Sequence, residues 1–251
     1  MLNLQLTGVT SVVALGAHPD DIEIGAGGLL LALADAVPDV RVRYVLFGGL
    51  PSRHAEARAA ARAFLPSADL TFDVHDLPDG RLPGHWNDVK QIVQDAAAVA
   101  ADLVLAPSRF DAHQDHRLLG ELAMTGFRDQ IVVHYEIPKW DGDLGQPNLY
   151  VPLTGAQATR KVELLNEHFP SQKAHDWWDD EVFFGLMRLR GMECRSRYAE
   201  AFTASKLALS LAGGGVSSQR RSRHQPGRPR LPRLPGEGSA PPSGRPDGAD
   251  R

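Results

Sequence analysis

The sequence predicts an α/β fold, a Rossmann-like three-layer arrangement in which helices cover both faces of a mostly parallel β-sheet. Short apolar runs alternate with longer segments of helical spacing along most of the chain, and this order is typical of parallel strands joined by crossover helices. The chain has 251 residues, 43% of them hydrophobic, which suits one large domain with its own core. Ligands of such sheets collect at the carboxyl ends of the strands, so we expect the functional site there.

The expected strands and helices follow from the period of the apolar residues. Strands are expected at 11–17, 40–47, 70–75, 102–106, 131–135 and 149–153. Helices are expected at 24–36, 52–64, 87–101, 155–168 and 180–190. The segment from Val40 alternates apolar and basic residues, which indicates a strand, whereas Val89, Ile92, Val93 and Ala96 have helical spacing.

The last 39 residues differ in composition from the rest, so we divide the chain into a domain at 1–212 and a tail at 213–251. The tail holds seven of the 18 prolines and eight of the 24 glycines, with eight Arg and three acidic residues. It has too few large apolar residues to bury, which predicts disorder. A tail without a role is favoured over a docking segment, and the product of an upstream frameshift is a third explanation.

Charge and cysteine content exclude several classes of protein. The net charge is −4, and the tail alone carries +5, so the domain is acidic and does not resemble a nucleic-acid-binding surface. Cys194 is the only cysteine, which rules out an internal disulfide and favours a reducing compartment. The N-terminus lacks a secretory signal, and no apolar run is long enough to span a membrane. We expect a cytoplasmic protein that binds neither membrane nor nucleic acid.

The first cluster of polar residues, Ala17-His18-Pro19-Asp20-Asp21, directly follows the first expected strand. Pro19 keeps His18 out of helical geometry, and an imidazole and a carboxylate three residues apart can bind one cation. Zinc takes nitrogen and oxygen ligands, and a catalytic site keeps one position open. The alternative is a solvated turn whose aspartates cap the next helix.

The second cluster, Asp111-Ala112-His113-Gln114-Asp115-His116, follows the strand expected at 102–106. Taken alone, it could be an ordinary capped entrance to a helix. Two such clusters at two strand ends of one sheet instead predict a metal site with three protein ligands, a base and a further histidine.

These two motifs, with the glycine-rich Gly25-Ala26-Gly27-Gly28 after the first, resemble the PIG-L/LmbE-like family of zinc-dependent N-deacetylases. The resemblance extends over roughly residues 12–202. It implies a single α/β domain and an enzyme that deacetylates an N-acetylated small molecule, most often an N-acetylglucosamine-type sugar or glycoconjugate. It also implies one zinc ion per chain, although iron or cobalt fits similar ligands, and it leaves a homo-oligomer open.

The resemblance assigns a role to each matching residue. It makes His18, Asp21 and His116 the zinc ligands. It makes Asp20 the general base and His113 the group that supports the oxyanion or protonates the leaving amine, with Asp115 orienting His113. Weaker matches make two residues substrate contacts. One is Arg53, which lies in an Arg-x-x-Glu segment with Glu56, and the other is Asp79.

The expected reaction is amide hydrolysis. Zinc lowers the pKa of bound water to about 7, Asp20 accepts a proton during attack, and His113 stabilises the charge that develops on oxygen. Three alternatives stay open: an amidase for a thiol conjugate or another acyl amide, a nucleotide-binding module, and a non-catalytic binding protein. The turn lacks the Gly-x-Gly-x-x-Gly pattern that a dinucleotide needs.

Overall fold

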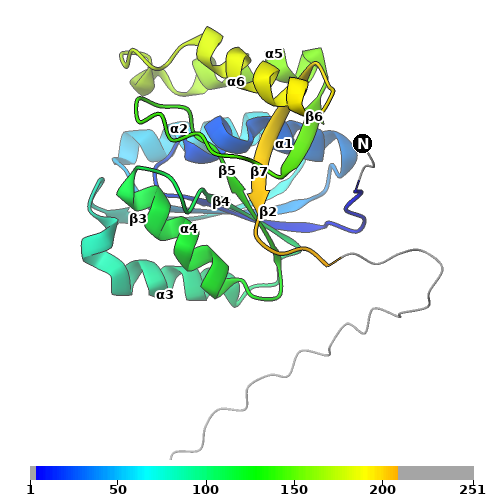
Figure 1. Cartoon of the computed structure of the whole chain (residues 1–251). Helices are drawn as coiled ribbons and strands as arrows, with labels where there is room; N and C mark the ends of the chain where they lie inside the picture. The colour runs from blue at the N-terminus through cyan, green and yellow to red at the C-terminus, as the bar shows by residue number, and fades with distance from the viewer. Residues whose placement is uncertain (1–3, 209–251) are drawn as a thin grey trace, which may run out of the picture. The chain divides into compact units, whose positions relative to one another are not determined.

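A computed structural model of the chain describes residues 4–208 and contains a seven-stranded sheet with the order β3-β2-β1-β4-β5-β7-β6 (Figure 1). The strands are β1 (Ser11–Gly16), β2 (Arg41–Gly48), β3 (Asp69–Leu77), β4 (Leu103–Pro107), β5 (Ile131–Tyr135), β6 (Leu149–Leu153) and β7 (Tyr198–Ala204). All pairings from β3 to β5 are parallel, and β7 runs antiparallel to both β5 and β6. The predicted fold class, with its mostly parallel sheet, is confirmed.

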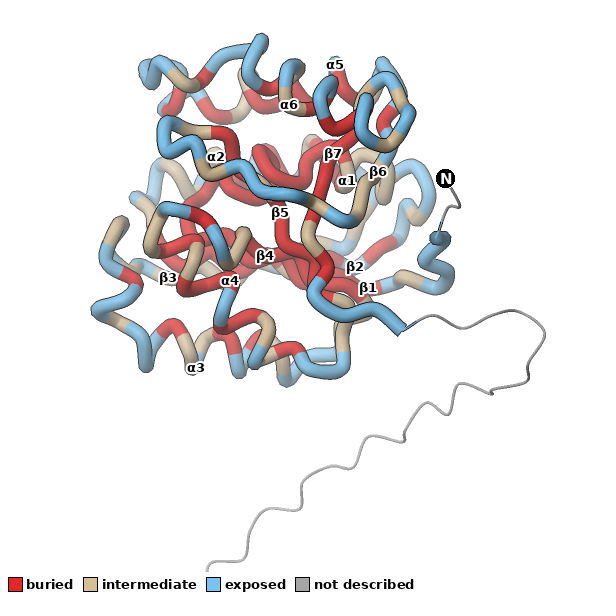
Figure 2. The backbone as a smooth tube through the Cα atoms, viewed as in Figure 1, coloured by how far each residue is buried: buried red, intermediate tan, exposed pale blue. Residues whose placement is uncertain are grey.

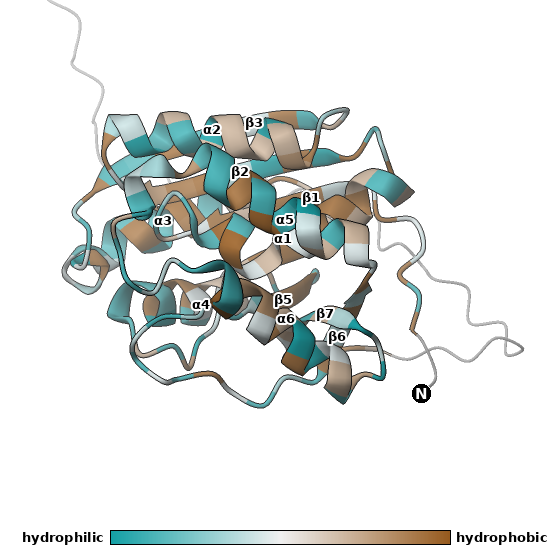
Figure 3. Cartoon of the chain, turned by 90° about the horizontal axis from the view of Figure 1, so that it is seen from above, coloured by the Kyte–Doolittle hydropathy of each residue, from teal (hydrophilic) through white to brown (hydrophobic). Residues whose placement is uncertain are grey.

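Helices cover both faces of the sheet (Figure 1). They are α1 (Asp21–Ala36), α2 (Pro51–Phe64), α3 (Trp86–Ala97), α4 (Gln114–Gly126), α5 (Gly155–His168) and α6 (Asp180–Glu193), with short 3₁₀-helices η1 (Leu82–His85) and η2 (Pro170–Gln172). Helices α1, α2, α5 and α6 contribute to one hydrophobic core, and α3 and α4 to a second on the opposite face. The strands between these cores are buried (Figure 2), and the helices carry both hydrophilic and hydrophobic residues (Figure 3). None of the helices in residues 4–208 is long and apolar enough to cross a bilayer.

A buried ion pair joins α1 to the C-terminal part of the sheet. Glu200 of β7 accepts the mid-helix N–H groups of Gly28 (2.6 Å) and Leu29 (2.7 Å). Lys161 of α5 donates to Glu200 (2.6 Å) and to the carbonyl of Ile24 (2.6 Å). Both charged side chains are buried, so each supplies the partner that burial of the other requires.

Most expected elements are present, with differences at their ends. β5, β6 and α5 have the predicted bounds, whereas α1 begins at Asp21, three residues before the expected start. The prediction omitted β7, which lies between β5 and β6. The tail predicted at 213–251 lies outside the described residues, as does the boundary at 212.

The sheet order brings the two polar clusters together. β1 pairs with β2 on one side and β4 on the other, and both pairings are parallel. The carboxyl ends of β1 and β4 therefore lie side by side, at the point where the order of strands reverses. Ligands of open α/β sheets bind at such a point, so the fold itself positions the site described next.

Candidate metal centre and active site

The first cluster lies in the tight turn between β1 and α1. The chain leaves β1 at Gly16, where a Cβ atom would lie 2.9 Å from the carbonyl oxygen of His18. Gly49 has a φ of +122°, and a Cβ there would meet the ring of Pro19 at 2.6 Å. The His18 N–H donates to Asp21 Oδ2 (2.8 Å), and both side chains are buried. The two glycines thus allow a compact turn that fixes His18 beside Asp21.

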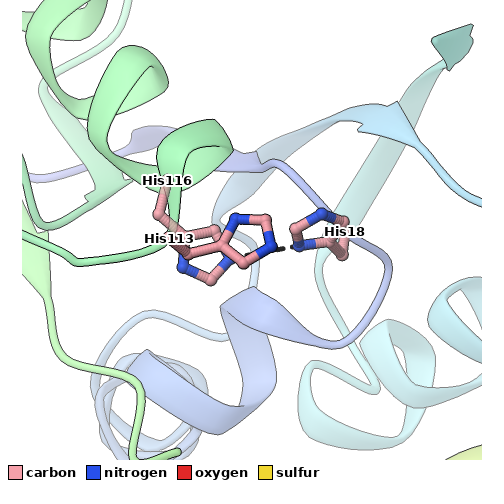
Figure 4. Close-up of side chains that lie close together, drawn as sticks. All are labelled: His18, His113 and His116. Carbon is pink, nitrogen blue, oxygen red and sulfur yellow. Dashed lines mark hydrogen bonds between the residues drawn. The ribbon is translucent and has the colours of Figure 1, made fainter. Parts of the chain in front are cut away.

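The second cluster forms the entrance to α4. His113 is the N-cap, and its Nδ1 accepts the N–H of Asp115 (3.3 Å). One helical turn later, His116 projects from the same end of α4, so both imidazoles face His18 across the strand ends (Figure 4). Because the site is built from the ends of two neighbouring strands, its geometry depends on the sheet and not on a single loop.

Three residues from the two clusters form a triangle suited to a metal ion, in which each oxygen of Asp21 faces a different histidine. The distances are 3.1 Å between His18 Nδ1 and His116 Nε2, 3.2 Å between His116 Nε2 and Asp21 Oδ1, and 3.6 Å between His18 Nδ1 and Asp21 Oδ2. Tetrahedral ligands about 2.0–2.1 Å from zinc lie about 3.3–3.4 Å apart. These three residues, which we call the donor triangle, therefore fit a divalent metal ion.

His113 lies close enough to join the same metal cluster. One nitrogen from each of His18, His113 and His116 falls within 4.8 Å of the others. A second group of His18, His113, Asp79 and Asp115 meets the same distance. His18 belongs to both groups and His116 to the first, so these two residues of the donor triangle also lie within a cluster that could hold a metal ion.

Carboxylates lie close to the outer nitrogens of both triangle histidines. Asp111 Oδ2 lies 3.1 Å from His116 Nδ1, and Asp79 Oδ1 and Asp115 Oδ2 lie 3.0 and 3.4 Å from His18 Nε2. Such contacts fix the ring orientation of metal ligands and raise their basicity. Burial lowers the pKa of His116, but Asp21 and Asp111 raise it more, to about 9.

Asp20 lies beside the triangle and is held by a basic side chain from α2. Its Oδ1 accepts a hydrogen bond from Arg53 Nη2 at 2.6 Å. Burial raises the pKa of Asp20, while the Arg53 guanidinium lowers it without cancelling the effect of burial. Arg53 and Asp20 line the same cavity as the triangle, so Asp20 is a carboxylate whose proton affinity is increased next to the metal donors.

His113 presents one nitrogen to this cavity as a donor. Since Nδ1 accepts the Asp115 N–H, a neutral ring carries its proton on Nε2. Burial lowers the pKa of His113, and His116 and His18 lower it further. His113 is thus a neutral N–H donor in this arrangement.

Asp115 makes contacts different from those that the resemblance implied. Its carboxylate accepts the N–H groups of Gly80 (2.7 Å) and Leu82 (3.0 Å) and approaches His18. Its backbone N–H, and not its carboxylate, contacts His113. Asp115 therefore holds the loop after β3 against the site, and that loop carries the half-exposed Asp79.

The polar residues surround a cavity of about 250 Å³. Its lining contains seven of the eight residues singled out from the sequence, namely His18, Asp20, Asp21, Arg53, Asp79, His113 and His116. It also contains Lys139, Trp140, Asp141, Gln172, His175 and Trp177. These come from the loop after β5 and from the segment at and after η2.

Sequence reasoning also gave no role to Asp111 and Lys139. Asp111 Oδ1 accepts Lys139 Nζ (2.9 Å) and the N–H of His113 (2.7 Å), while its Oδ2 faces His116. Asp111 stands five residues before His116 in the second motif, and this spacing was the available signal. Nothing in the sequence connects Lys139 with that motif.

Residues 13–127 match the model of the PIG-L family, described as GlcNAc-PI de-N-acetylase. The chain is therefore similar to the PIG-L family over this segment. The matched residues include both polar clusters and the donor triangle, so the resemblance drawn from the two motifs is confirmed.

Two curated relatives match the chain. "Uncharacterized deacetylase YaiS" of Escherichia coli (strain K12) is 26% identical over 170 residues, 62% of this chain and 89% of the relative. "Succinoglycan biosynthesis transport protein ExoP" of Rhizobium meliloti (strain 1021) is 38% identical over 79 residues, 30% of this chain. The second match spans only 10% of ExoP, so it gives no basis for comparing the two proteins as wholes.

Solved structures share the fold of the chain. The N,N'-diacetylchitobiose deacetylase of Pyrococcus horikoshii has a TM-score of 0.58 at 20% identity, over 78% of this chain and 84% of its own. The 4-carboxy-2-hydroxymuconate hydratase GalB of Pseudomonas putida KT2440 has a TM-score of 0.62 at 16% identity, over 80% and 98%. One fold thus serves a deacetylase and a hydratase, so these likenesses show the fold alone. The family match and the deacetylase relative support a hydrolase of the N-deacetylase type.

Proposed function

We propose that this chain is a zinc-dependent deacetylase that removes the acetyl group from an N-acetylated small molecule, most simply an N-acetylglucosamine-type sugar or glycoconjugate. The donor triangle of His18, Asp21 and His116 carries the proposal, because its edges of 3.1–3.6 Å fit tetrahedral zinc. The family description supports the acetylated sugar. Bound zinc would supply Lewis acidity and lower the pKa of a coordinated water.

Asp20 is the proposed general base. It lines the cavity with the triangle, and burial raises the pKa of its carboxyl group. A base with a raised pKa retains a proton more readily once it has taken one from water, which favours proton transfer near neutral pH. Arg53 holds the carboxylate by its Oδ1 (2.6 Å), which orients Asp20 while leaving Oδ2 free of that contact.

His113 is the proposed donor to the developing oxyanion. Its Nδ1 is occupied by the Asp115 N–H, so the proton of the neutral ring lies on Nε2. A preorganised N–H next to an oxyanion typically stabilises the transition state by about 3–4 kcal/mol. Asp20, once protonated, is the nearest source of a proton for the leaving amine, because the pKa of His113 is lowered by burial and by its two histidine neighbours.

The test is acetate release from a panel of acetylated substrates. The panel contains N-acetylglucosamine, N-acetylglucosaminides and an acetylated cysteine conjugate. We expect release from the sugars, loss of release with a chelator, and recovery with zinc. Release that a chelator leaves intact would refute the metal, and release from the cysteine conjugate alone would favour an amidase.

Variants separate the metal from the reaction. His116→Ala should lose zinc by elemental analysis. His85→Ala is the matched control, since that histidine is 40% exposed and does not line the cavity. Full zinc content in His116→Ala would contradict its proposed role as a ligand.

A further inference from the structure

Helix α6 carries an apolar stripe on the face that points away from the core. Val182, Leu189 and Met192 are 37%, 44% and 59% exposed, and a Cβ atom at the exposed Gly185 would meet no other group within 4 Å. We call these four residues the α6 stripe. The opposite face of α6 is buried in the core that it shares with α1, α2 and α5 (Figures 1 and 2). Because that face already anchors the helix, the stripe does not contribute to the core and needs another explanation.

The spacing of the stripe is that of a surface for packing helices. Its four positions follow one another at intervals of three, four and three residues. Residues at these intervals lie in one line along a helix, and the same intervals form the seam between two paired helices. Gly185 lies near the middle of α6, where the lack of a side chain lets a second helix approach closely. The stripe therefore fits a helix that crosses α6 at Gly185.

The charges along one edge of the stripe indicate which helix this is. Glu181 and Arg188 lie on the same edge, two helical turns apart, and both are exposed. Within residues 4–208 neither forms an ion pair, and Arg188 donates to the carbonyl of Arg197 (3.2 Å). In an antiparallel pair of α6 helices that cross at Gly185, Glu181 of each copy faces Arg188 of the other. The edge is therefore complementary in charge to itself.

Two other occupants fit the stripe less well. The tail at 213–251 has three large aliphatic residues and no aromatic one, so it offers little apolar surface to cover four positions. Helices that lie on an anionic membrane carry Lys and Arg on their polar face. Helix α6 instead begins with Asp180 and Glu181 and ends at Glu193. A second copy of the same helix matches both the apolar spacing and the charges.

We propose that α6 forms the contact between two copies of this chain, which pair antiparallel about a two-fold axis close to Gly185. Such an axis uses the same surface on both copies, so each stripe covers the other. Val182 of one copy packs on Leu189 of the other, and two pairs of Glu181 with Arg188 close one edge of the contact. The inference does not depend on the proposed reaction, because the stripe is separate from the donor triangle.

The test measures the mass of the full-length chain by analytical ultracentrifugation over a range of concentrations. We expect an equilibrium that shifts from monomer to dimer as the concentration rises, since one helix pair buries less than the about 1,600 Å² of a standard interface. Leu189→Glu places a charge in the seam and should weaken dimerisation at least about 30-fold. Val99→Glu is the matched control, because Val99 is 48% exposed and follows α3, on the opposite face of the sheet.

Exchange of the two charges tests the antiparallel arrangement. Glu181→Arg places like charges opposite each other in both pairs, as does Arg188→Glu, and each should weaken dimerisation about 10-fold. The double variant restores opposite charges and should dimerise within about twofold of the wild type. Residues seven positions apart do not meet on one helix, so this recovery requires contact between two copies. Glu121→Arg, at an exposed position of α4, is the control.

Circular dichroism checks that each variant is folded, as expected for substitutions at exposed positions. A chain that stays monomeric at every concentration overturns the inference, and so does a dimer that Leu189→Glu leaves intact. A double charge variant that dimerises no better than the single variants overturns the antiparallel pairing about Gly185.

Discussion

Replacing Asp111 by Asn should weaken metal binding although Asp111 is not a proposed ligand. Its Oδ2 faces His116 Nδ1 at 3.1 Å, and its Oδ1 accepts both Lys139 Nζ and the His113 N–H. An Asn of the same shape can keep its oxygen toward His116, but its NH₂ group then faces two other donors. The side chain is buried, so solvent cannot relieve this conflict.

The size of the effect follows from these contacts. Loss of a carboxylate behind a metal-bound histidine lowers metal affinity by about 10–100-fold. In Asp111→Asn the new NH₂ group also faces two hydrogen-bond donors, so we expect a loss of metal affinity near 100-fold, which equals about 2.7 kcal/mol. Packing should change little, because Asn and Asp have nearly the same volume.

Zinc affinity is measured by competition with a chromophoric chelator. Asp143→Asn is the matched control, since Asp143 also binds Lys139 (2.7 Å) but has no contact with His116. We expect Asp143→Asn to bind zinc within about twofold of the wild type. Equal affinities for Asp111→Asn and wild type would refute the reasoning, and so would an equal loss in both variants.

Three further variants test the site and the fold. Asp20→Asn should keep its zinc and lose nearly all turnover, and a rate near that of the wild type would remove Asp20 as the base. Lys161→Met leaves the Glu200 carboxylate buried without its cation, so urea unfolding should show a loss of about 3 kcal/mol, with recovery in the double variant with Glu200→Gln. Burial raises the pKa of Asp102, but backbone and hydroxyl donors from the start of β1 lower it overall. The ionised Asp102 therefore stabilises the fold at pH values above its unfolded pKa of about 3.9, and this stabilisation is lost as the pH falls through the lower pKa of the folded state. Asp102→Asn should therefore flatten the fall of Tm below pH 4.

The sequence predicted the parts of the fold that local pattern determines. Apolar runs located six of the seven strands, and the two polar clusters were expected at the ends of β1 and β4, where the structure has them. β7 was not predicted because Glu200 interrupts a short run of small residues, and Lys161, the partner of Glu200, lies 39 residues away. A charged residue in the middle of an apolar segment is consistent with a buried strand only when the residue of opposite charge that pairs with it is known.

The site shows the same division between local and distant information. Both halves of the donor triangle lie within short motifs, so spacing and resemblance were enough to suggest them. The contacts of Asp115 with the loop after β3, of Lys139 with Asp111, and of Trp140 with Asp176 join residues 28–36 positions apart. The spacing of residues along the sequence cannot predict such contacts, because only the tertiary fold brings these segments together.

The bonds from Glu200 to α1 bear on how the protein assembles. Helix α1 is made early in synthesis and carries Asp21 at its first turn, yet the acceptor for its central N–H groups lies 172 residues later. Contacts of such long range form late in folding, since a large loop must close first. The metal-binding end of α1 is therefore not locked until β7 has inserted between β5 and β6. A growing chain would thus complete the proposed metal site only after β7 has joined the sheet.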